Sequence, residues 1–325
     1  MEMMINWRET SENASREEKG SVLEAIKKKV FDIYGQMIAG EKPVRNPREI
    51  VEKLKTKYKL IVDEKIVRLT LAAFYAGRPV LYEGPPGTGK TEIGEAILSL
   101  WAGKPAFVLP CSDNYDEYRV IGDFHPLMAL KYGFNEKSYI PKPLLAAIVL
   151  DAGVLVDEIR RSSDEFQNML LDIIDKRRII VPELKLIIKS NGIGFQFIFT
   201  SNPEDIAQNE LSDAFLRRIV RIEFGYPPPE IEYEIIKLRY DAKPKIDPSL
   251  IKRVIIAARE LRKNVLYKPG VSDTVMWVRL AGRIAELRGS NMIEKRDLLE
   301  AAMSVLYKRV GEEDAVDNVL QRVFG

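Results

Sequence analysis

The chain has 325 residues, 46% of them hydrophobic and 30% charged, with a formal net charge of +2. This is enough for two packed domains, and so balanced a charge argues against a strongly basic nucleic-acid-binding protein. The single cysteine, Cys111, excludes an intrachain disulfide framework, and the single histidine, His125, argues further against a zinc site. Because no apolar run reaches the ~20 residues that span a bilayer and no signal-peptide pattern opens the chain, we expect a cytoplasmic protein.

The first 60 residues are predicted to form a helical extension. Residues 1–15 are expected to be disordered, and apolar residues at helical spacing from Val22 to Met37 predict a helix that ends near Gly40. A second helix is expected to start at Pro47, because asparagine is a favoured helix cap and proline is favoured at the first helical position, and Asn46 precedes Pro47.

From residue 61 to 226 the pattern is typical of an α/β domain. A helix over 63–76 precedes four short apolar runs at 79–82, 106–109, 154–156 and 195–200, which predict buried strands. Helical segments, among them 93–100 and one that ends at 147–150, separate these runs. Strands that alternate with helices predict a parallel sheet with helices on both faces.

After the proline-rich segment 226–229 only helical patterns remain, so we predict an all-α lid domain over 227–325. One helix is expected to open at Asp247, Ser272 is expected to cap another, and a third is predicted over 293–308. The predicted domains are therefore 1–60, 61–226 and 227–325.

A glycine-rich segment after the first predicted strand fits the pattern G-x-x-x-x-G-K-[ST] in full. Its residues are Gly84, Pro85, Pro86, Gly87, Thr88, Gly89, Lys90 and Thr91. In this pattern backbone N–H groups and the positive end of the following helix surround the phosphates of a nucleotide. Lys90 is expected to reach the β- and γ-phosphates, and the Thr91 hydroxyl to hold Mg²⁺. The segment therefore predicts binding of ATP with Mg²⁺.

Two acids end the third predicted strand, where ligands bind in parallel sheets. Asp157 is expected to hold the Mg²⁺ hydration shell, and Glu158 to orient and polarise the attacking water. Asn202 ends the next strand, and its amide is expected to orient the same water. Arg217 and Arg218 follow a predicted helix, and an arginine supplied across a subunit boundary stabilises transition-state charge. Arg218 is the favoured candidate for this finger, with Arg217 as the alternative.

These four motifs, in this order, resemble those of the AAA+ ATPases, and in finer detail the MoxR family in its helix-2-insert branch. Supporting segments are 121–124, 143–148, 157–161, 179–186, which resembles a hairpin of that family, and 306–309. The resemblance covers residues 61–310. It implies Lys90 and Thr91 as Walker A, Asp157 and Glu158 as Walker B, Asn202 as sensor 1 and Arg218 as the finger.

Two positions depart from the family pattern. Arg160 stands where the family has Asn, which puts any role of that amide in doubt. The lid motif Gly-Ala-Ser-Pro-Arg is here the segment 270–274, with Thr274 in place of the sensor 2 arginine. Arg279 lies five residues further on, which at 3.6 residues per turn places it off that helix face. We therefore predict that this helix carries no sensor 2 arginine.

The family resemblance implies an oligomeric, hexameric ring that couples ATP hydrolysis to chaperone-like remodelling of protein partners, such as a protein with a von Willebrand A domain. The alternatives are a nucleic-acid motor or helicase-like ATPase and a nucleotide-gated scaffold of low turnover. The near-neutral charge argues against the motor, although residues 177–189 carry four basic side chains, and the intact Glu158 argues against the scaffold. Residues alone identify neither the client nor the role of residues 1–60.

Overall fold

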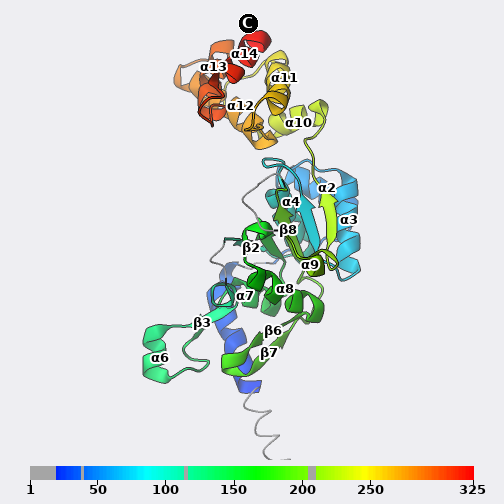
Figure 1. The fold of residues 1–325 in the computed structure, drawn as a ribbon, viewed down its shortest axis with the longest axis vertical. Coiled ribbons are helices and arrows are strands. Elements are labelled where there is room, and N and C mark those ends of the chain that lie inside the picture. Colours follow the sequence, from blue (N-terminus) through cyan, green and yellow to red (C-terminus); the bar gives the residue numbers. More distant parts are fainter. Residues whose placement is uncertain (1–19, 38–39, 113–115, 204–209) are drawn as a thin grey trace, which may run out of the picture.

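The computed structural model describes residues 20–37, 40–112, 116–203 and 210–325 (Figure 1). At its centre lies a five-stranded sheet in the order β2-β5-β8-β1-β9. The strands are β1 Val80–Glu83, β2 Phe107–Pro110, β5 Val154–Asp157, β8 Phe197–Ser201 and β9 Val220–Glu223. Every neighbouring pair is parallel, and β1 and β8 are buried throughout. Burial on both faces explains why these strands appear in the sequence as continuous apolar runs.

Helices cover both faces of the sheet. On one face α2 Pro47–Thr56, α3 Glu64–Tyr75 and α4 Lys90–Ala102 share one hydrophobic core with alternate strand residues. On the other face lie α7 Pro143–Leu150 and α8 Asp164–Lys176, together with part of the helix over residues 20–34. Short helical pieces η1 Gly35–Met37, η2 Ile159–Arg161 and α9 Asp213–Leu216 complete this part. Residues 44–60, assigned by sequence to the extension, thus pack into the core of the sheet domain.

Two excursions leave the sheet domain at the end remote from the lid (Figure 1). The first follows α5 Glu117–Val120 and consists of β3 Gly122–Phe124, α6 Pro126–Tyr132 and β4 Tyr139–Pro141. The second is a hairpin of β6 Arg178–Val181 and β7 Leu186–Lys189, joined by η3 Pro182–Leu184. The second excursion confirms the hairpin expected at 179–186.

The C-terminal part contains five helices: α10 Pro229–Arg239, α11 Pro248–Asn264, α12 Val271–Leu287, α13 Lys295–Val305 and α14 Glu313–Phe324. They enclose their own hydrophobic core around the fully buried Trp277. In Figure 1 this bundle stands beyond the end of the sheet that carries the start of α4, joined to it by the segment after β9. The architecture confirms a P-loop α/β core with a parallel sheet, a helical lid and helices ahead of the core.

Several local predictions differ from the structure in detail. The N-cap of α12 is Gly270 and not Ser272. The Gly270 N–H donates to Asp273 Oδ2 at 2.7 Å, so the carboxylate of a residue in the first helical turn satisfies this backbone donor. The last predicted strand starts at Phe197 rather than Phe195, and the helix expected from 293 starts at Lys295. Strand β9 was not among the strands predicted from the sequence. Residues 1–15 lie outside the described residues. Among the helices described, none has the length and apolarity to cross a membrane.

Candidate functional site

The predicted site residues lie at the carboxyl ends of three neighbouring strands. Parallel registration places Glu83 of β1 opposite Ser201 of β8, and Val156 of β5 opposite Phe199. The glycine-rich loop, Asp157 and Asn202 therefore all leave the sheet at the same edge. This edge faces the lid in Figure 1.

The glycine-rich loop connects β1 to α4. Gly87 and Gly89 have φ of 70° and 85°, a left-handed conformation that glycine adopts without a steric cost. Gly89 is also the N-cap of α4, so the free N–H groups of the first helical turn adjoin the loop. Thr88 Oγ1 donates to the Pro85 carbonyl at 3.0 Å. The loop thus has the conformation that anion binding by backbone N–H groups requires.

Lys90 is only 6% exposed, and its amine donates to the carbonyls of Gly84 and Pro85, each at 2.8 Å. Burial lowers the pKa of this amine, and the nearby carboxylates of Glu158 and Asp157 partly oppose that shift. If a phosphate bound here, the Lys90 amine would donate to an anion in place of the two neutral carbonyl oxygens that it contacts in this structure.

The acidic strand end and the start of α4 meet at one carboxylate oxygen. Asp157 Oδ1 accepts hydrogen bonds from Thr91 Oγ1 at 2.7 Å and from Thr200 Oγ1 at 2.6 Å. The Thr200 hydroxyl also accepts from the Glu158 N–H at 2.9 Å. Thr200 thereby fixes both acids to β8, a role that sequence reasoning missed because a threonine near a strand end carries no distinctive pattern.

Glu158 itself has a left-handed backbone conformation, with φ of 57°, directly after β5. Its carboxylate lies 3.7 Å from Arg161 Nε, and it lines the same cavity as Lys90 and Thr91. For a residue other than glycine this conformation is uncommon, and such outliers are concentrated at functional sites. It turns the chain immediately after Asp157, so the two adjacent acids have different surroundings.

The cavity beside the loop has a volume of about 240 Å³ and extends from the phosphate-binding residues to an apolar end. That end is lined by Leu60 and Ile61, which precede α3, and by Ile235 of α10. Arg239 at the end of α10 forms an ion pair with Glu92 of α4 across the cavity wall. The arrangement offers an apolar slot between the sheet domain and the lid, continuous with the phosphate loop.

The lid touches the glycine-rich loop backbone to backbone. The Ser272 N–H donates to the Gly87 carbonyl at 3.1 Å. A Cβ on Gly87 would lie 2.9 Å from the Gly270 Cα, and one on Gly270 would lie 2.7 Å from the Gly87 Cα. Neither position has space for a side chain, because the two backbones pack directly against each other.

The remaining predicted residues lie in different surroundings. Asn202 lines a neighbouring cavity together with Pro86 and Gly87 of the loop. Arg218 forms an ion pair with Asp175 of α8 at 2.7 Å and also donates to the Ala214 carbonyl. Arg217 is exposed, and within the described part of the chain its guanidinium has no hydrogen bond or ion pair.

A buried carboxylate, Glu83, was also missed by sequence reasoning. It is 4% exposed at the end of β1 and pairs with Arg160 Nη2 at 2.9 Å and with Arg221 of β9. Arg160 Nε donates in addition to Ser201 Oγ at 2.8 Å. Arg160, which replaces the family's Asn, thus joins the segment after Glu158 to the ends of β1 and β8. Only the tertiary fold brings these residues together.

Comparison with known proteins identifies the architecture around this site. Residues 79–219 match the model of the AAA domain, dynein-related subfamily. The chain carries an AAA domain. A solved structure of a RuvB mutant from Thermotoga maritima shares the fold, with a TM-score of 0.50 at 16% identity over 77% of this chain and 72% of that one.

Two named relatives are similar over more than the AAA domain. The protein CbbQ of Hydrogenophilus thermoluteolus is 27% identical over 177 residues, which are 54% of this chain and 63% of CbbQ. The gas vesicle ATPase GvpN of Ancylobacter aquaticus is 26% identical over 242 residues, 69% of this chain and 65% of GvpN. The resemblance to MoxR-like AAA+ ATPases expected from the sequence is supported by these matches.

Proposed function

We propose that this AAA protein binds ATP with Mg²⁺ and hydrolyses it as an oligomeric ring. The observation that carries the proposal is the meeting of Thr91, Asp157 and Thr200 at one carboxylate oxygen, in the cavity that also contains Lys90 and Glu158. The name of the relative GvpN, a gas vesicle ATPase, supports the same activity.

The oxygen donors fit a magnesium site. Thr91 Oγ1 and Asp157 Oδ1 are hard ligands 2.7 Å apart, and Mg²⁺ in nucleotide sites takes one or two protein oxygens and completes its shell with water and phosphate. When bound, the ion would neutralise charge on the β- and γ-phosphates. Lys90 would leave the Gly84 and Pro85 carbonyls and bind the phosphates, and Glu158 would accept a proton from the attacking water.

Two substitutions separate binding from turnover. Lys90→Ala should abolish ATP binding in a titration with a fluorescent nucleotide, because the buried ammonium is lost. Glu158→Gln should keep ATP affinity and lose phosphate release, because the amide cannot take the proton. Hydrolysis by Glu158→Gln at the wild-type rate would show that the Walker B assignment is wrong.

The ring is part of the proposal because an arginine at the end of α9 would complete the site of a neighbouring subunit. Arg217 is exposed and unpaired among the described residues, whereas Arg218 would first have to leave Asp175. Losing such a finger costs about 10³-fold or more in rate. A dilute monomer should therefore be nearly inactive, and the assembled ring, expected to be a hexamer, should be active.

Mixing experiments test the finger and distinguish the two arginines. A Lys90→Ala chain mixed with an Arg217→Ala chain, each inactive alone, should regain part of the activity, because some interfaces then combine an intact loop with an intact finger. The same mixture with Arg218→Ala tests the other candidate. If Arg218 is the finger, Asp175→Asn should raise the rate. Full activity of dilute monomers would exclude a finger in trans.

We further propose that hydrolysis remodels a protein partner, as the MoxR-like relationship suggests, in the cytoplasm. Glu158→Gln, which should hold ATP, is the suitable bait for capture from native cells. A partner with a von Willebrand A domain would support remodelling. Single-stranded DNA or replication proteins in the catch would support the alternative of a nucleic-acid motor and contradict this part of the proposal.

A further inference from the structure

Arg160 lies in the short turn after Glu158, and its side chain reaches two neighbouring strands. Its Nη2 pairs with Glu83 at the end of β1 at 2.9 Å, and its Nε donates to Ser201 Oγ at the end of β8 at 2.8 Å. The residues that line the two cavities beside the glycine-rich loop do not include Arg160. Any effect of this arginine on a bound nucleotide must therefore pass through the residues that it holds.

Both partners of Arg160 stand one residue before a part of the proposed site. Glu83 precedes Gly84, the first residue of the glycine-rich loop, and Ser201 precedes Asn202, whose amide is expected to orient the attacking water. The two strand ends are also joined directly, because the Gly84 N–H donates to the Ser201 carbonyl at 3.2 Å. Arg160 therefore attaches its own turn to the strand ends from which the loop and the amide follow.

The turn that contains Arg160 has an uncommon backbone conformation. Glu158 has a φ of 57°, and a residue other than glycine keeps this left-handed conformation only where the surrounding structure holds it there. On one side the Glu158 N–H donates to Thr200 Oγ1 at 2.9 Å. On the other side Ile159 is fully buried, and the two contacts of Arg160 fix the next residue. The direction of the Glu158 side chain thus depends on attachments on both sides of it.

Glu83 pairs with two arginines that come from different parts of the sheet domain. Its side chain is 4% exposed, so both positive charges compensate a carboxylate that has been removed from water. Arg160 follows β5, whereas Arg221 belongs to β9 at the edge of the sheet, is 54% exposed, and also pairs with Glu223 at 3.1 Å. The two arginines therefore share the neutralisation of Glu83, but of the two only Arg160 belongs to the turn after Glu158.

We propose that Arg160 is a positioning residue for ATP hydrolysis, which holds the turn that directs the Glu158 carboxylate toward the attacking water. The inference rests on the proposed nucleotide site and concerns turnover rather than binding. In the reaction the water oxygen bonds to the γ-phosphorus, one water proton passes to Glu158, and the bond to the bridging oxygen breaks with ADP as the leaving group. A base must lie within hydrogen-bond reach of that proton, so a shifted turn slows the step.

The test measures turnover and nucleotide affinity separately in two matched variants of the full chain. Phosphate release at saturating ATP gives the rate, titration with Mg²⁺ and the non-hydrolysable analogue AMP-PNP gives the affinity, and sedimentation at the assay concentration compares assembly. Arg160→Gln should lower the rate by about 10- to 100-fold, as expected for a base misplaced by about 1 Å, and leave the affinity nearly unchanged. Arg221→Gln removes the other, more exposed charge beside Glu83 and should lower the rate by about threefold or less.

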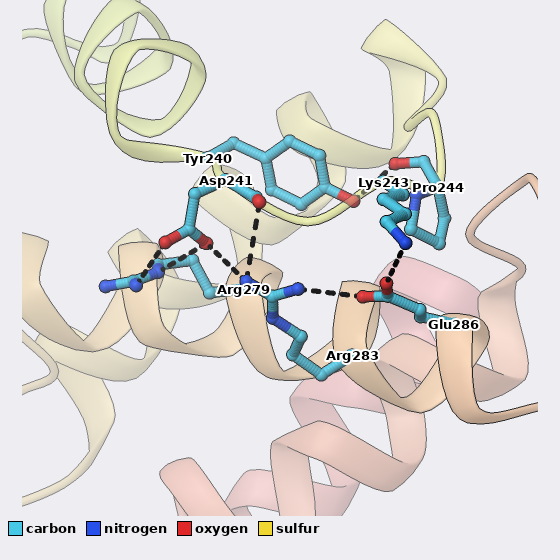
Figure 2. A network of polar contacts seen from close by, with 7 residues as sticks. All are labelled: Tyr240, Asp241, Lys243, Pro244, Arg279, Arg283 and Glu286. Atoms are coloured by element: carbon cyan, nitrogen blue, oxygen red, sulfur yellow. Dashed lines mark hydrogen bonds and ion pairs between the residues drawn. The ribbon is translucent and has the colours of Figure 1, made fainter.

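An arginine of the lid provides a second control. Arg279 of α12 binds Asp241 through Nη2 at 2.6 Å and Nε at 3.1 Å, the same two nitrogen atoms that Arg160 uses. Figure 2 shows Arg279 and Arg283 turned toward the segment after α10, and neither lines the two cavities at the loop. Arg279→Gln should therefore change neither rate nor affinity. Arg160→Lys keeps the charge without the planar fork that reaches both partners, and should recover only part of the rate lost in Arg160→Gln.

The outcomes separate this inference from the proposed function. Equal losses of rate in Arg160→Gln and Arg221→Gln would show that the charge beside Glu83 matters and the turn does not, and would overturn the inference while the nucleotide site stands. A parallel fall of rate and affinity in Arg160→Gln would overturn it as well. If that variant does not assemble, Arg160→Lys decides, because a wild-type rate in Arg160→Lys contradicts the inference. A wild-type protein that neither binds AMP-PNP nor releases phosphate would refute the proposed function, and the inference with it.

Discussion

Replacing Arg262 of α11 by leucine should destabilise the lid without unfolding the sheet domain. Glu232 is 0% exposed, and the Arg262 side chain, 7% exposed, provides its only positive charge among the described contacts. Arg262→Leu would leave the carboxylate with the Thr274 hydroxyl alone. Removing one partner of a buried ion pair costs about 3–5 kcal/mol, which shifts the unfolding equilibrium of the lid by more than about 100-fold.

Urea unfolding of protein labelled with 5-fluorotryptophan measures this effect by ¹⁹F NMR. Trp277 lies in the lid core and Trp101 in the sheet core, so their signals report the two parts separately. The Trp277 midpoint should fall strongly and the Trp101 midpoint little. Arg259→Leu, three residues earlier on the same helix, loses only a 3.3 Å bond to the Pro227 carbonyl and should cost less than about 1 kcal/mol.

Removing both charges of the Glu232–Arg262 pair should destabilise the lid less than removing the arginine alone. Glu232→Leu combined with Arg262→Leu should recover most of the lost stability, because no buried charge remains without a partner. Equal effects of Arg262→Leu and Arg259→Leu, or a double variant less stable than Arg262→Leu alone, would refute the idea that this pair supports the lid.

Three further predictions concern Lys90, Cys111 and the Glu92–Arg239 ion pair. Burial lowers the pKa of the Lys90 amine and a bound phosphate raises it, so nucleotide binding at alkaline pH should take up a proton, and nucleotide affinity should fall as pH rises through the lowered pKa. Calorimetry in two buffers of different ionisation enthalpy measures this proton uptake. Proton release on binding would contradict the prediction. Burial and the nearby acids raise the pKa of Cys111 to about 12, so iodoacetamide at pH 8.5 should modify it only after unfolding. Glu92→Gln removes the Glu92–Arg239 ion pair and should speed nucleotide release severalfold in stopped-flow measurements. The exchanged pair Glu92→Arg, Arg239→Glu should restore the slow release of the wild-type protein. An unchanged release rate in Glu92→Gln would show that the pair does not close the cavity.

The sequence predicted those parts of the site that lie in continuous motifs. The glycine-rich loop and the strand that ends at Asp157 are each a few consecutive residues, and the fold brings both to the same edge of the sheet. Their roles in binding and hydrolysis stay predictions. Thr200 and the Glu83–Arg160 pair escaped prediction because their partners lie about 40 to 80 positions away in the chain and only strand order makes them neighbours.

Other differences came from local interactions that compete. Ser272 has the residue type of a helix cap, but Asp273 accepts a hydrogen bond from the Gly270 N–H, so α12 starts at Val271, earlier in the chain than predicted. Strand β9 escaped prediction because alternate residues, such as Arg221 and Glu223, are charged at the sheet edge, so its apolar pattern is short. The preference for Arg218 as the finger rested on family position, and its ion pair with Asp175 was not visible in the sequence.

The contact between Gly87 and Gly270 has a mechanical consequence. Since the two backbones touch without intervening side chains, a small shift of the loop is passed to α12 without being absorbed by rotamer changes. Helix α12 has 17 residues, so it acts as a rigid lever about 25 Å long at 1.5 Å per residue. A tilt of about 5° at the glycine pivot would move its far end by about 2 Å over that length. The lid would thereby amplify a small displacement of the glycine-rich loop into a larger movement at the far end of α12.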